Sequence, residues 1–561
     1  MVSGLGRLLA ALVLAGLPCV AAAQTPLKSE LGREQRRFQL PQLPKAQAPE
    51  RFQPLAVPSL PRRGGLDMDA EGPANFTLRS LRVTGSTVYD NTELRPFYAE
   101  FLGREVTLEK LRAVSKRITK KYADDGYVIS RAAAPEKDPE AEGAVVIRVI
   151  EGYIERVEWP AAISRYRDFF SDYAAKITAD RPLNVRTLQH YLDASDLPGL
   201  NFAYKWKALR PADGAFVLIV TVTEKPLDLM VRVDNRGTNS RGPGQSLSQA
   251  AFNNLFGRHE ALTFAYANSF EPRELEYFAG KYRQVLDIEG LNFLLNGTFS
   301  TGRPGAELRA FDYKYKGTNF ETGLSSALVR SKERNLTLSG LLFASDSSSN
   351  LLGLPFTEDR LRGVRLLLDG DSVDDLKGNN QWNLTLSQGF KGLGSTQMGS
   401  ALASIANGRA DFTKVEASAN RTQKLANGFS TYVSASSQYG FNPELSGEQC
   451  GYGGRDFGRA FDPSQLSGDR CWMLLAELRY DLWEKPAGAR PAAQLFGFLD
   501  HGKIYFANPL PGFLPSDGGS SAGGGFRFNW EHLKTDFVFA KGIDSEHERV
   551  WRFYFTVTLK N

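Results

Sequence analysis

The chain has 561 residues, a formal net charge of +5 and three cysteines. A charge this small for the length, with basic residues interspersed among acidic ones, argues against nucleic acid as a partner. Beyond the N-terminal segment, no stretch offers the roughly eighteen consecutive apolar residues that a membrane-spanning helix needs, and this excludes a helical membrane protein.

The N-terminal segment, residues 1–23, has the pattern of a signal peptide. A basic residue precedes an apolar run, and three consecutive alanines end the segment at Ala23. We therefore expect the mature protein to leave the cytoplasm. Residues 24–73 are polar and proline-rich, with one helix-compatible stretch at 28–38. We expect a short helix on an extended tether there, with a disordered terminus as the alternative.

Two successive segments, residues 74–152 and 153–225, repeat the same order of predicted elements. Each begins with a strand, continues with two amphipathic helices and ends with two strands, which makes a compact α+β unit. The strands are expected at 76–85, 127–133, 144–150, 154–159, 201–209 and 215–222, and the helices at 90–102, 107–125, 166–177 and 185–194. We interpret the recurrence, at a period of roughly seventy-five residues, as an internal repeat.

Residues 226–561 lose the helical periodicity and alternate apolar with polar side chains at a period of two. Clear examples run from Trp472 to Asp481 and from Phe553 to Lys560. This alternation predicts an antiparallel transmembrane β-barrel, which must close because no backbone group can stay unpaired in lipid. At roughly twenty residues per strand and connection, the segment accommodates about sixteen strands. Such a barrel has a wet lumen unless it is plugged, and the candidate plugs are the N-terminal helix and the charged insertion at 439–470.

The sequence contains no catalytic, cofactor-binding or metal-binding pattern. The five histidines are scattered, and the His259-Glu260 pair lacks the second histidine of a zinc-binding helix. No Walker lysine motif, nucleophile elbow or glycine-rich phosphate loop occurs. The aspartates of residues 369–375 lack the spacing of a calcium loop and are interpreted as a solvated hairpin end. We therefore expect neither an enzyme nor a cofactor-dependent protein.

The repeat resembles two POTRA domains, at residues 74–152 and 153–225. The residues that carry this resemblance are Gly85, Gly126, Tyr127, Glu151 and Gly152, together with the Asp196–Gly199 step of the second unit.

The C-terminal half is similar to the barrel of two-partner secretion transporters of the haemolysin-activator and filamentous-haemagglutinin type. The similarity rests on three stretches in a specific order and spacing: Val233–Gly237, Phe457–Asp462 and Gly497–Gly502. Together with the repeat, it covers essentially the whole mature chain.

The resemblance implies that the long loop folds into the lumen, where its arginine pairs with an acidic residue of the inner wall. The residues in these places are Phe457, Gly458, Arg459, Phe461 and Asp462 of the loop, and Phe498 and Asp500 of the wall. An arginine fork suits such a pairing because it offers directional bonds to a carboxylate. This chain departs from the family at Ala460, where a glycine is usual, and at its C-terminus, where Asn561 replaces a phenylalanine.

Two cysteines, Cys450 and Cys471, bracket the motif of the long loop, whereas Cys19 lies in the predicted signal peptide. They can form a disulfide in an oxidising compartment or remain two thiols. A disulfide would close the loop and restrict how far it can leave the lumen.

The resemblance implies type V secretion from the bacterial outer membrane, with the POTRA domains in the periplasm. These domains would capture the N-terminal secretion domain of a large exoprotein, which then threads the barrel without ATP. The implied partners are that exoprotein, outer-membrane lipid and the barrel-assembly machinery that inserts the barrel. Two alternatives stay open: an insertion factor of the barrel-assembly class, which usually carries more POTRA repeats, and a diffusion porin, which has no need of two periplasmic domains.

Overall fold

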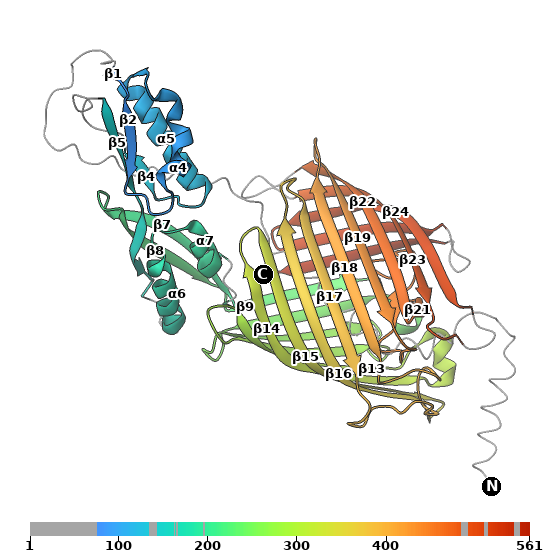
Figure 1. Cartoon of the computed structure of the whole chain (residues 1–561). Helices are drawn as coiled ribbons and strands as arrows, with labels where there is room; N and C mark the ends of the chain where they lie inside the picture. The colour runs from blue at the N-terminus through green and yellow to red at the C-terminus, as the bar shows by residue number, and fades with distance from the viewer. Residues whose placement is uncertain are drawn as a thin grey trace, which may run out of the picture.

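The computed structural model of the protein describes residues 76–133, 143–161, 163, 166–193, 197–483, 492–509, 514–543 and 550–561. These residues form two small α+β units and one large closed barrel (Figure 1). None of the helices within these ranges is long and apolar enough to cross a membrane. The predicted signal peptide, N-terminal helix and tether lie outside the described residues.

The first unit is a three-stranded sheet covered by one long helix. The sheet has the order β2 (Ser80–Thr84), β5 (Ala144–Ile150) and β4 (Arg131–Ala133), with β2 parallel and β4 antiparallel to β5. Helix α5 (Leu108–Asp124) begins after Thr107, whose side chain accepts the Lys110 amide. Its buried stripe packs with the sheet into one apolar core.

The predicted helix over residues 90–102 was too long. The structure has a four-residue helix, α4 (Asn91–Leu94), followed by the 3₁₀ turns η1 (Arg95–Phe97) and η2 (Ala99–Phe101). Pro96 lies in the first of these turns. Because proline lacks an amide proton and its ring crowds the preceding turn, the α-helix ends before it. Two short strands, β1 (Phe76–Thr77) and β3 (Glu105–Val106), pair beside this region.

The second unit has the same topology as the first. Its elements are β6 (Tyr153–Glu158), α6 (Arg167–Ala179), α7 (Val185–Leu188), the π-turn η4 (Gln189–Asp193), β7 (Leu200–Arg210) and β8 (Ala215–Glu224). The sheet order is β6-β8-β7, with β6 parallel and β7 antiparallel to β8, so that strand order and directions match those of the first unit.

The remaining strands close into a barrel of sixteen antiparallel strands, which confirms the predicted architecture. They are β9 (Leu227–Asp234), β10 (Gln245–Asn253), β11 (Glu260–Ser269), β12 (Glu276–Val285), β13 (Leu291–Gly302), β14 (Lys314–Arg330), β15 (Arg334–Leu351), β16 (Leu354–Val373), β17 (Asn379–Gly389), β18 (Thr413–Lys424), β19 (Phe429–Gly440), β22 (Arg470–Trp483), β23 (Ala492–Tyr505), β24 (Ser516–Trp530), β25 (Leu533–Gly542) and β26 (Trp551–Lys560). The predicted alternation holds: Leu474 and Leu478 face outward, whereas Met473 and Glu477 are buried inside.

The barrel closes where β9 meets β26, through a ladder of only five residue pairs. An asparagine side chain extends this ladder at each end. Asn561 donates to the Leu227 carbonyl (3.0 Å) and accepts the Leu229 amide (2.8 Å). Asn235 forms the equivalent bonds with the backbone of β26 at the other end. The Asn561 side chain thus takes part in closing the barrel.

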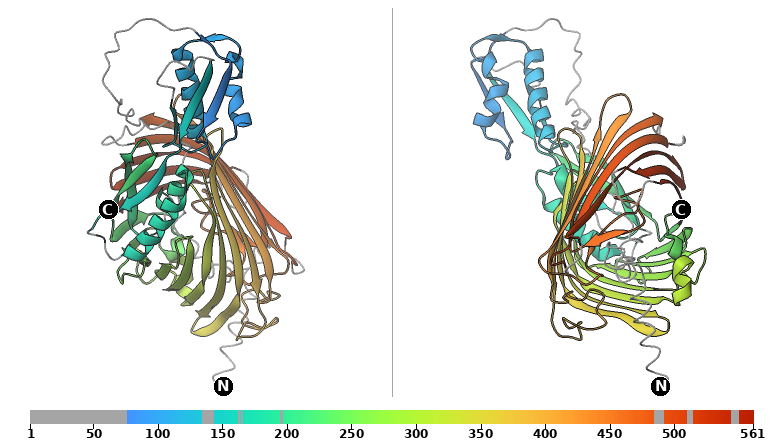
Figure 2. Two further views of the ribbon diagram at one scale, coloured as in Figure 1. Left: turned by 60° about the vertical axis from the view of Figure 1, so that its left-hand side comes forward. Right: turned by 90° about the vertical axis from the view of Figure 1, so that its right-hand side faces the viewer.

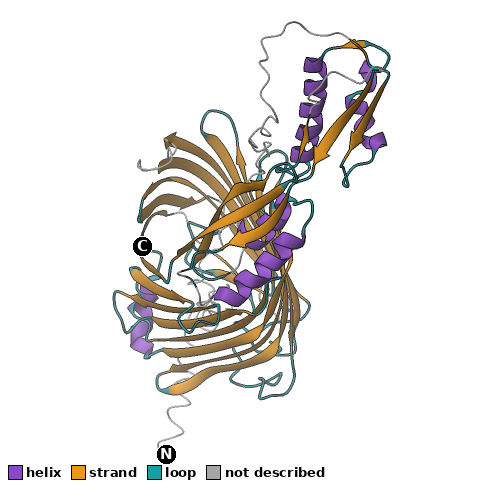
Figure 3. Ribbon diagram, turned by 90° about the vertical axis from the view of Figure 1, so that its left-hand side faces the viewer, coloured by secondary structure: helices purple, strands orange, loops and turns teal. Residues whose placement is uncertain are grey.

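The second unit lies against one end of the barrel, and the first unit projects beyond it (Figures 1 and 2). Glu289, in the turn between β12 and β13, accepts a hydrogen bond from Tyr191 (3.1 Å) and pairs with Lys176 (3.0 Å) and His190 (3.3 Å). These three contacts join the second unit to the barrel at Glu289. The long helices are confined to the two units, as Figure 3 shows.

Candidate lumen latch

The insertion between β19 and β22 folds back into the barrel. Residues 441–469 form this lumen loop, which contains a hairpin of β20 (Cys450–Tyr452) and β21 (Leu466–Gly468). Its apolar side chains pack against inward-facing residues of the wall, which removes both surfaces from water. The buried cluster contains Tyr452, Ala460, Phe461 and Leu466 of the loop with Met473, Leu475, Phe496, Phe498, Val538 and Ala540 of the wall.

Arg459 is buried in the lumen, but its predicted ion pair with Asp500 is wrong. The guanidinium Nη2 lies 2.6 Å from Oε1 of Glu477, on β22. Asp500 instead accepts the backbone amide of Arg459 at 3.2 Å. Since four donors already surround the Asp500 carboxylate, the long arginine side chain reaches past it to the neighbouring strand. Glu477 lies directly across the ladder from Phe498, two residues from Asp500.

Asp500 holds the loop through hydrogen bonds instead. Its Oδ1 accepts from the Tyr452 hydroxyl (2.8 Å), the Gly458 amide (3.1 Å) and the Ser521 hydroxyl (2.7 Å), in addition to the Oδ2 contact with Arg459. Gly458 has φ +67°, and a Cβ there would approach the Gly453 amide. A glycine is therefore required for two successive amides to point at one carboxylate.

Glu477 is the functional candidate that the sequence motifs missed. Only 2 % of this residue is exposed, and three arginines surround its carboxylate. Arg459 and Arg479 lie 2.6 Å away, and Arg527 of β24 lies 3.0 Å away. The inward position of Glu477 in an alternating strand was a usable signal, because a carboxylate buried there needs a cation.

Aromatic rings complete the pocket around the arginine. The Arg459 guanidinium carbon lies 4.6 Å from the ring centre of Phe498, an arrangement that favours a cation–π interaction. Phe461 is fully buried, and Phe457 packs against the same cluster while remaining partly exposed. Asp462 pairs with Arg552 of β26, so the loop also contacts the strand at the barrel seam.

Cys450 and Cys471 are joined by a disulfide, with their Cα atoms 6.4 Å apart. Cys450 begins β20 and Cys471 lies in β22. The bond therefore attaches the loop hairpin covalently to the barrel wall.

The POTRA signature residues form a separate structural site in the first unit. Glu151 accepts the amides of Thr87 (2.7 Å) and Val88 (3.2 Å) and the hydroxyl of Tyr122 (2.9 Å). Burial raises the pKa of Tyr122 above its ordinary value, so the hydroxyl stays protonated as a donor. Three further signature residues lie at the ends of β2, α5 and β5, namely Gly85, Gly126 and Gly152, and Tyr127 packs near Tyr122.

Among the described residues, no group of three or more histidine, cysteine, aspartate or glutamate side chains is placed to hold a metal ion. In the described part of the lumen, Arg459, Arg479 and Arg527 pair with Glu477.

A family model described as "Haemolysin secretion/activation protein ShlB/FhaC/HecB" matches residues 213–524, more than half of the chain. The chain belongs to this family. A second model, "POTRA domain, ShlB-type", matches residues 76–152. The haemolysin secretion/activation family consists of transporters, so this barrel spans the outer membrane, its POTRA region lies in the periplasm, and it translocates an exoprotein by two-partner secretion. The insertion-factor and porin alternatives are not favoured.

Curated relatives and solved structures agree with this assignment. The chain is 23 % identical over 433 residues to "Outer membrane transporter CdiB" of Dickeya dadantii, covering 75 % of each chain. It is 24 % identical over 464 residues to the Escherichia coli protein of the same name, covering 78 % of this chain and 74 % of that one. The structure of CdiB from Escherichia coli superimposes with a TM-score of 0.67 at 20 % identity, over 91 % of this chain and 94 % of that one, which shows a shared fold.

Proposed function

We propose that this member of the haemolysin secretion/activation family keeps its lumen closed with the lumen loop and opens it by releasing Arg459 from Glu477. The observation that carries the proposal is the position of Arg459, buried in the lumen and paired with the wall at 2.6 Å. An ion pair in a partly wet lumen is a reversible bond, because water that enters as the loop moves solvates both charges.

The wall opposite the latch supports a path for a polypeptide. Between the lumen loop and this wall lies a cavity of about 660 Å³ with polar lining, including Arg232, Asp234, Glu321, Arg365, Asp369 and Glu416. An extended polypeptide carries unpaired backbone donors and acceptors, and such a lining offers them partners. Movement of the loop toward the solvent would widen this cavity into a channel.

In this proposal, the periplasmic units capture the exoprotein in an unfolded state. Within the described residues β7 pairs only with β8, so that its other side is available to an added strand. Strand addition uses backbone hydrogen bonds and tolerates many side chains, which suits an unfolded segment. Folding of the exoprotein outside the cell would then drive transport without ATP.

We further propose that the barrel-assembly machinery inserts this barrel and reads aromatic residues of β26. Phe553 is nearly half exposed on the outer face of β26, and Phe555 follows on the same face. These aromatics can supply the signal that this machinery reads.

The test measures secretion of a co-expressed large exoprotein by cells that carry Arg459→Ala. Arg362→Ala is the matched control, because Arg362 of β16 also forms a 2.6 Å ion pair with a carboxylate, that of Asp346, but lies outside the loop. Heat-modifiable gel mobility checks that each barrel is inserted. We expect Arg459→Ala to insert normally and to lose most secretion while the control secretes normally. Normal secretion by Arg459→Ala would show that the latch has no role.

A further inference from the structure

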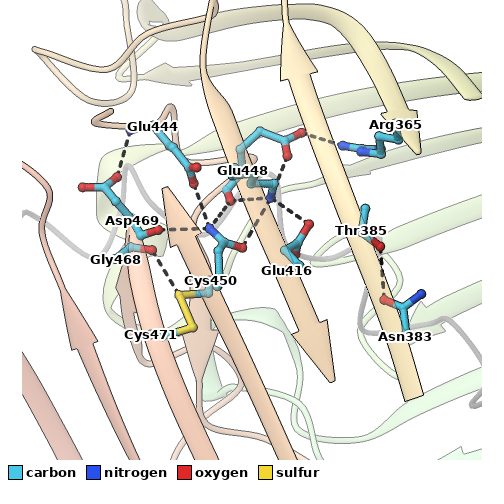
Figure 4. A network of polar contacts seen from close by, with 12 residues as sticks. Arg365, Asn383, Thr385, Glu416, Glu444, Glu448, Cys450, Gly468, Asp469 and Cys471 are labelled. Carbon is cyan, nitrogen blue, oxygen red and sulfur yellow. Dashed lines mark hydrogen bonds and ion pairs between the residues drawn. A yellow bond between two sulfur atoms is a disulfide. The ribbon is translucent and has the colours of Figure 1, made fainter. Parts of the chain in front are cut away.

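The lumen loop has a second contact with the barrel wall, away from Arg459 (Figure 4). Glu448 Oε1 lies 2.7 Å from Nη2 of Arg365 on β16, and Oε2 lies 2.8 Å from Nζ of Lys414 on β18. The Glu448 and Lys414 side chains are almost fully buried. Here the loop contributes the carboxylate and the wall contributes the cations, whereas in the Arg459 contact the loop contributes the cation.

Backbone and amide groups reinforce this second contact. Lys414 Nζ and Gln438 Nε2 both donate to the Glu448 carbonyl at 2.8 Å. Asp469, at the other end of the loop, accepts the Glu444 amide (2.9 Å) and the Gln449 side chain (3.1 Å). Both ends of the loop are thus tied to each other and to the wall.

The disulfide joins the loop covalently to the wall close to Glu448, because Cys450 is two residues from Glu448 and Cys471 belongs to β22. Cys450 is also the first residue of the hairpin of β20 and β21. We call residues 444–452 with 466–469 the root of the loop, and residues 453–465 the tip.

The tip differs from the root in how it is held. Its attachments are noncovalent: the Arg459 ion pair, the amides bound to Asp500 and the pair between Asp462 and Arg552. At the boundary between root and tip, Gly453 and Gly454 have φ +119° and +118°. Two successive glycines let the backbone change direction at little steric cost, as a hinge requires.

We propose that Glu448 is a positioning residue that, with the disulfide, keeps the root against the wall while only the tip swings to open the lumen. This inference rests on the proposed function of the loop as a closure. The segment that moves is then the thirteen residues 453–465 and not the whole loop. The cluster can tolerate loss of Glu448, since Lys414 also pairs with Glu416 (3.2 Å) and Arg365 with Glu321 (2.5 Å).

The test is hydrogen–deuterium exchange of the purified full-length protein, followed by mass spectrometry of root and tip peptides. In Arg459→Ala we expect tip amides to exchange at least about ten-fold faster while root amides keep the wild-type rate. In Glu448→Gln we expect root amides to exchange at least about ten-fold faster, because a buried ion pair has been broken. Glu448→Asp, which keeps the charge, should restore part of the protection.

Glu416→Gln is the matched control, because it removes the other carboxylate on Lys414 without touching the loop. Its root and tip amides should exchange as in the wild type. Equal acceleration of root and tip in Arg459→Ala would mean that the loop moves as one body and would overturn the proposal. Unchanged root exchange in Glu448→Gln would overturn it as well. Neither result depends on secretion, so a failure here is distinguishable from a failure of the transport assay.

Discussion

Replacing Asp500 with asparagine should release the tip of the lumen loop without unfolding the barrel. The carboxylate accepts four hydrogen bonds, two of them from the amides of Gly458 and Arg459. In the variant, the new side-chain amide nitrogen at position 500 would face the backbone N–H of Arg459, so that two donors meet. The other three donors would meet a neutral carbonyl oxygen instead of a carboxylate. The geometry of the wall would otherwise be preserved, because asparagine and aspartate have nearly the same shape.

The size of the effect follows from these four contacts. A hydrogen bond to a charged group contributes about 1 kcal/mol more than one to a neutral group, and a buried donor left unsatisfied costs about 1–3 kcal/mol. Only the Gly458 and Arg459 amides belong to the tip, because Tyr452 lies in the root and Ser521 in the wall. The docked tip therefore loses about 2–4 kcal/mol, an upper value because lumen water can satisfy released groups. A loss of about 2.8 kcal/mol, within this range, corresponds to a roughly hundredfold shift toward the undocked tip.

Conductance in planar lipid bilayers measures this shift. We expect Asp500→Asn channels to be open for a much larger fraction of the time than wild-type channels, with unchanged heat-modifiable mobility. Asp369→Asn is the control for losing a negative charge in the lumen, since Asp369 lines the cavity and bonds Asn383 at 2.7 Å. The reasoning is refuted if Asp500→Asn conducts like the wild type, or if the control opens the channel equally.

Two further predictions concern the barrel seam and the first unit. Asn561→Ala removes two side-chain hydrogen bonds that extend the five-pair ladder between β9 and β26, so the temperature at which the heat-modifiable band shifts should fall by about 2–4 °C. Lys560→Ala should leave this temperature nearly unchanged, and an equal fall in both variants would show that the asparagine side chain has no special role. Glu151→Gln weakens four hydrogen bonds, two from Thr87 and one each from Val88 and Tyr122, and should destabilise the first unit by about 2–4 kcal/mol. Limited proteolysis of the full-length protein should then cut residues 76–152 faster than in the wild type, with barrel fragments unaffected. Equal cutting in variant and wild type would show that Glu151 is not a structural anchor.

Much of the architecture was predictable because it depends on local patterns. Leu474, Leu478 and Glu477 sit on the faces that their alternation predicts. The Pro96 break in the first predicted helix was also readable from the sequence, since the rule that ends a helix before proline needs no tertiary information. The Phe457–Asp462 motif located the loop that enters the lumen, although its pattern did not reveal the partner of Arg459.

The sequence by itself determined that this chain forms a closed barrel, because a period of two in lipid permits no open edge. Only the tertiary structure decided which charges meet inside it. Arg459 pairs with Glu477 because the register of β22 and β23 sets Glu477 opposite Phe498, beside an Asp500 that is already satisfied. Glu448 meets Arg365 and Lys414 across 83 and 34 residues of sequence, through a fold-back that no local pattern encodes.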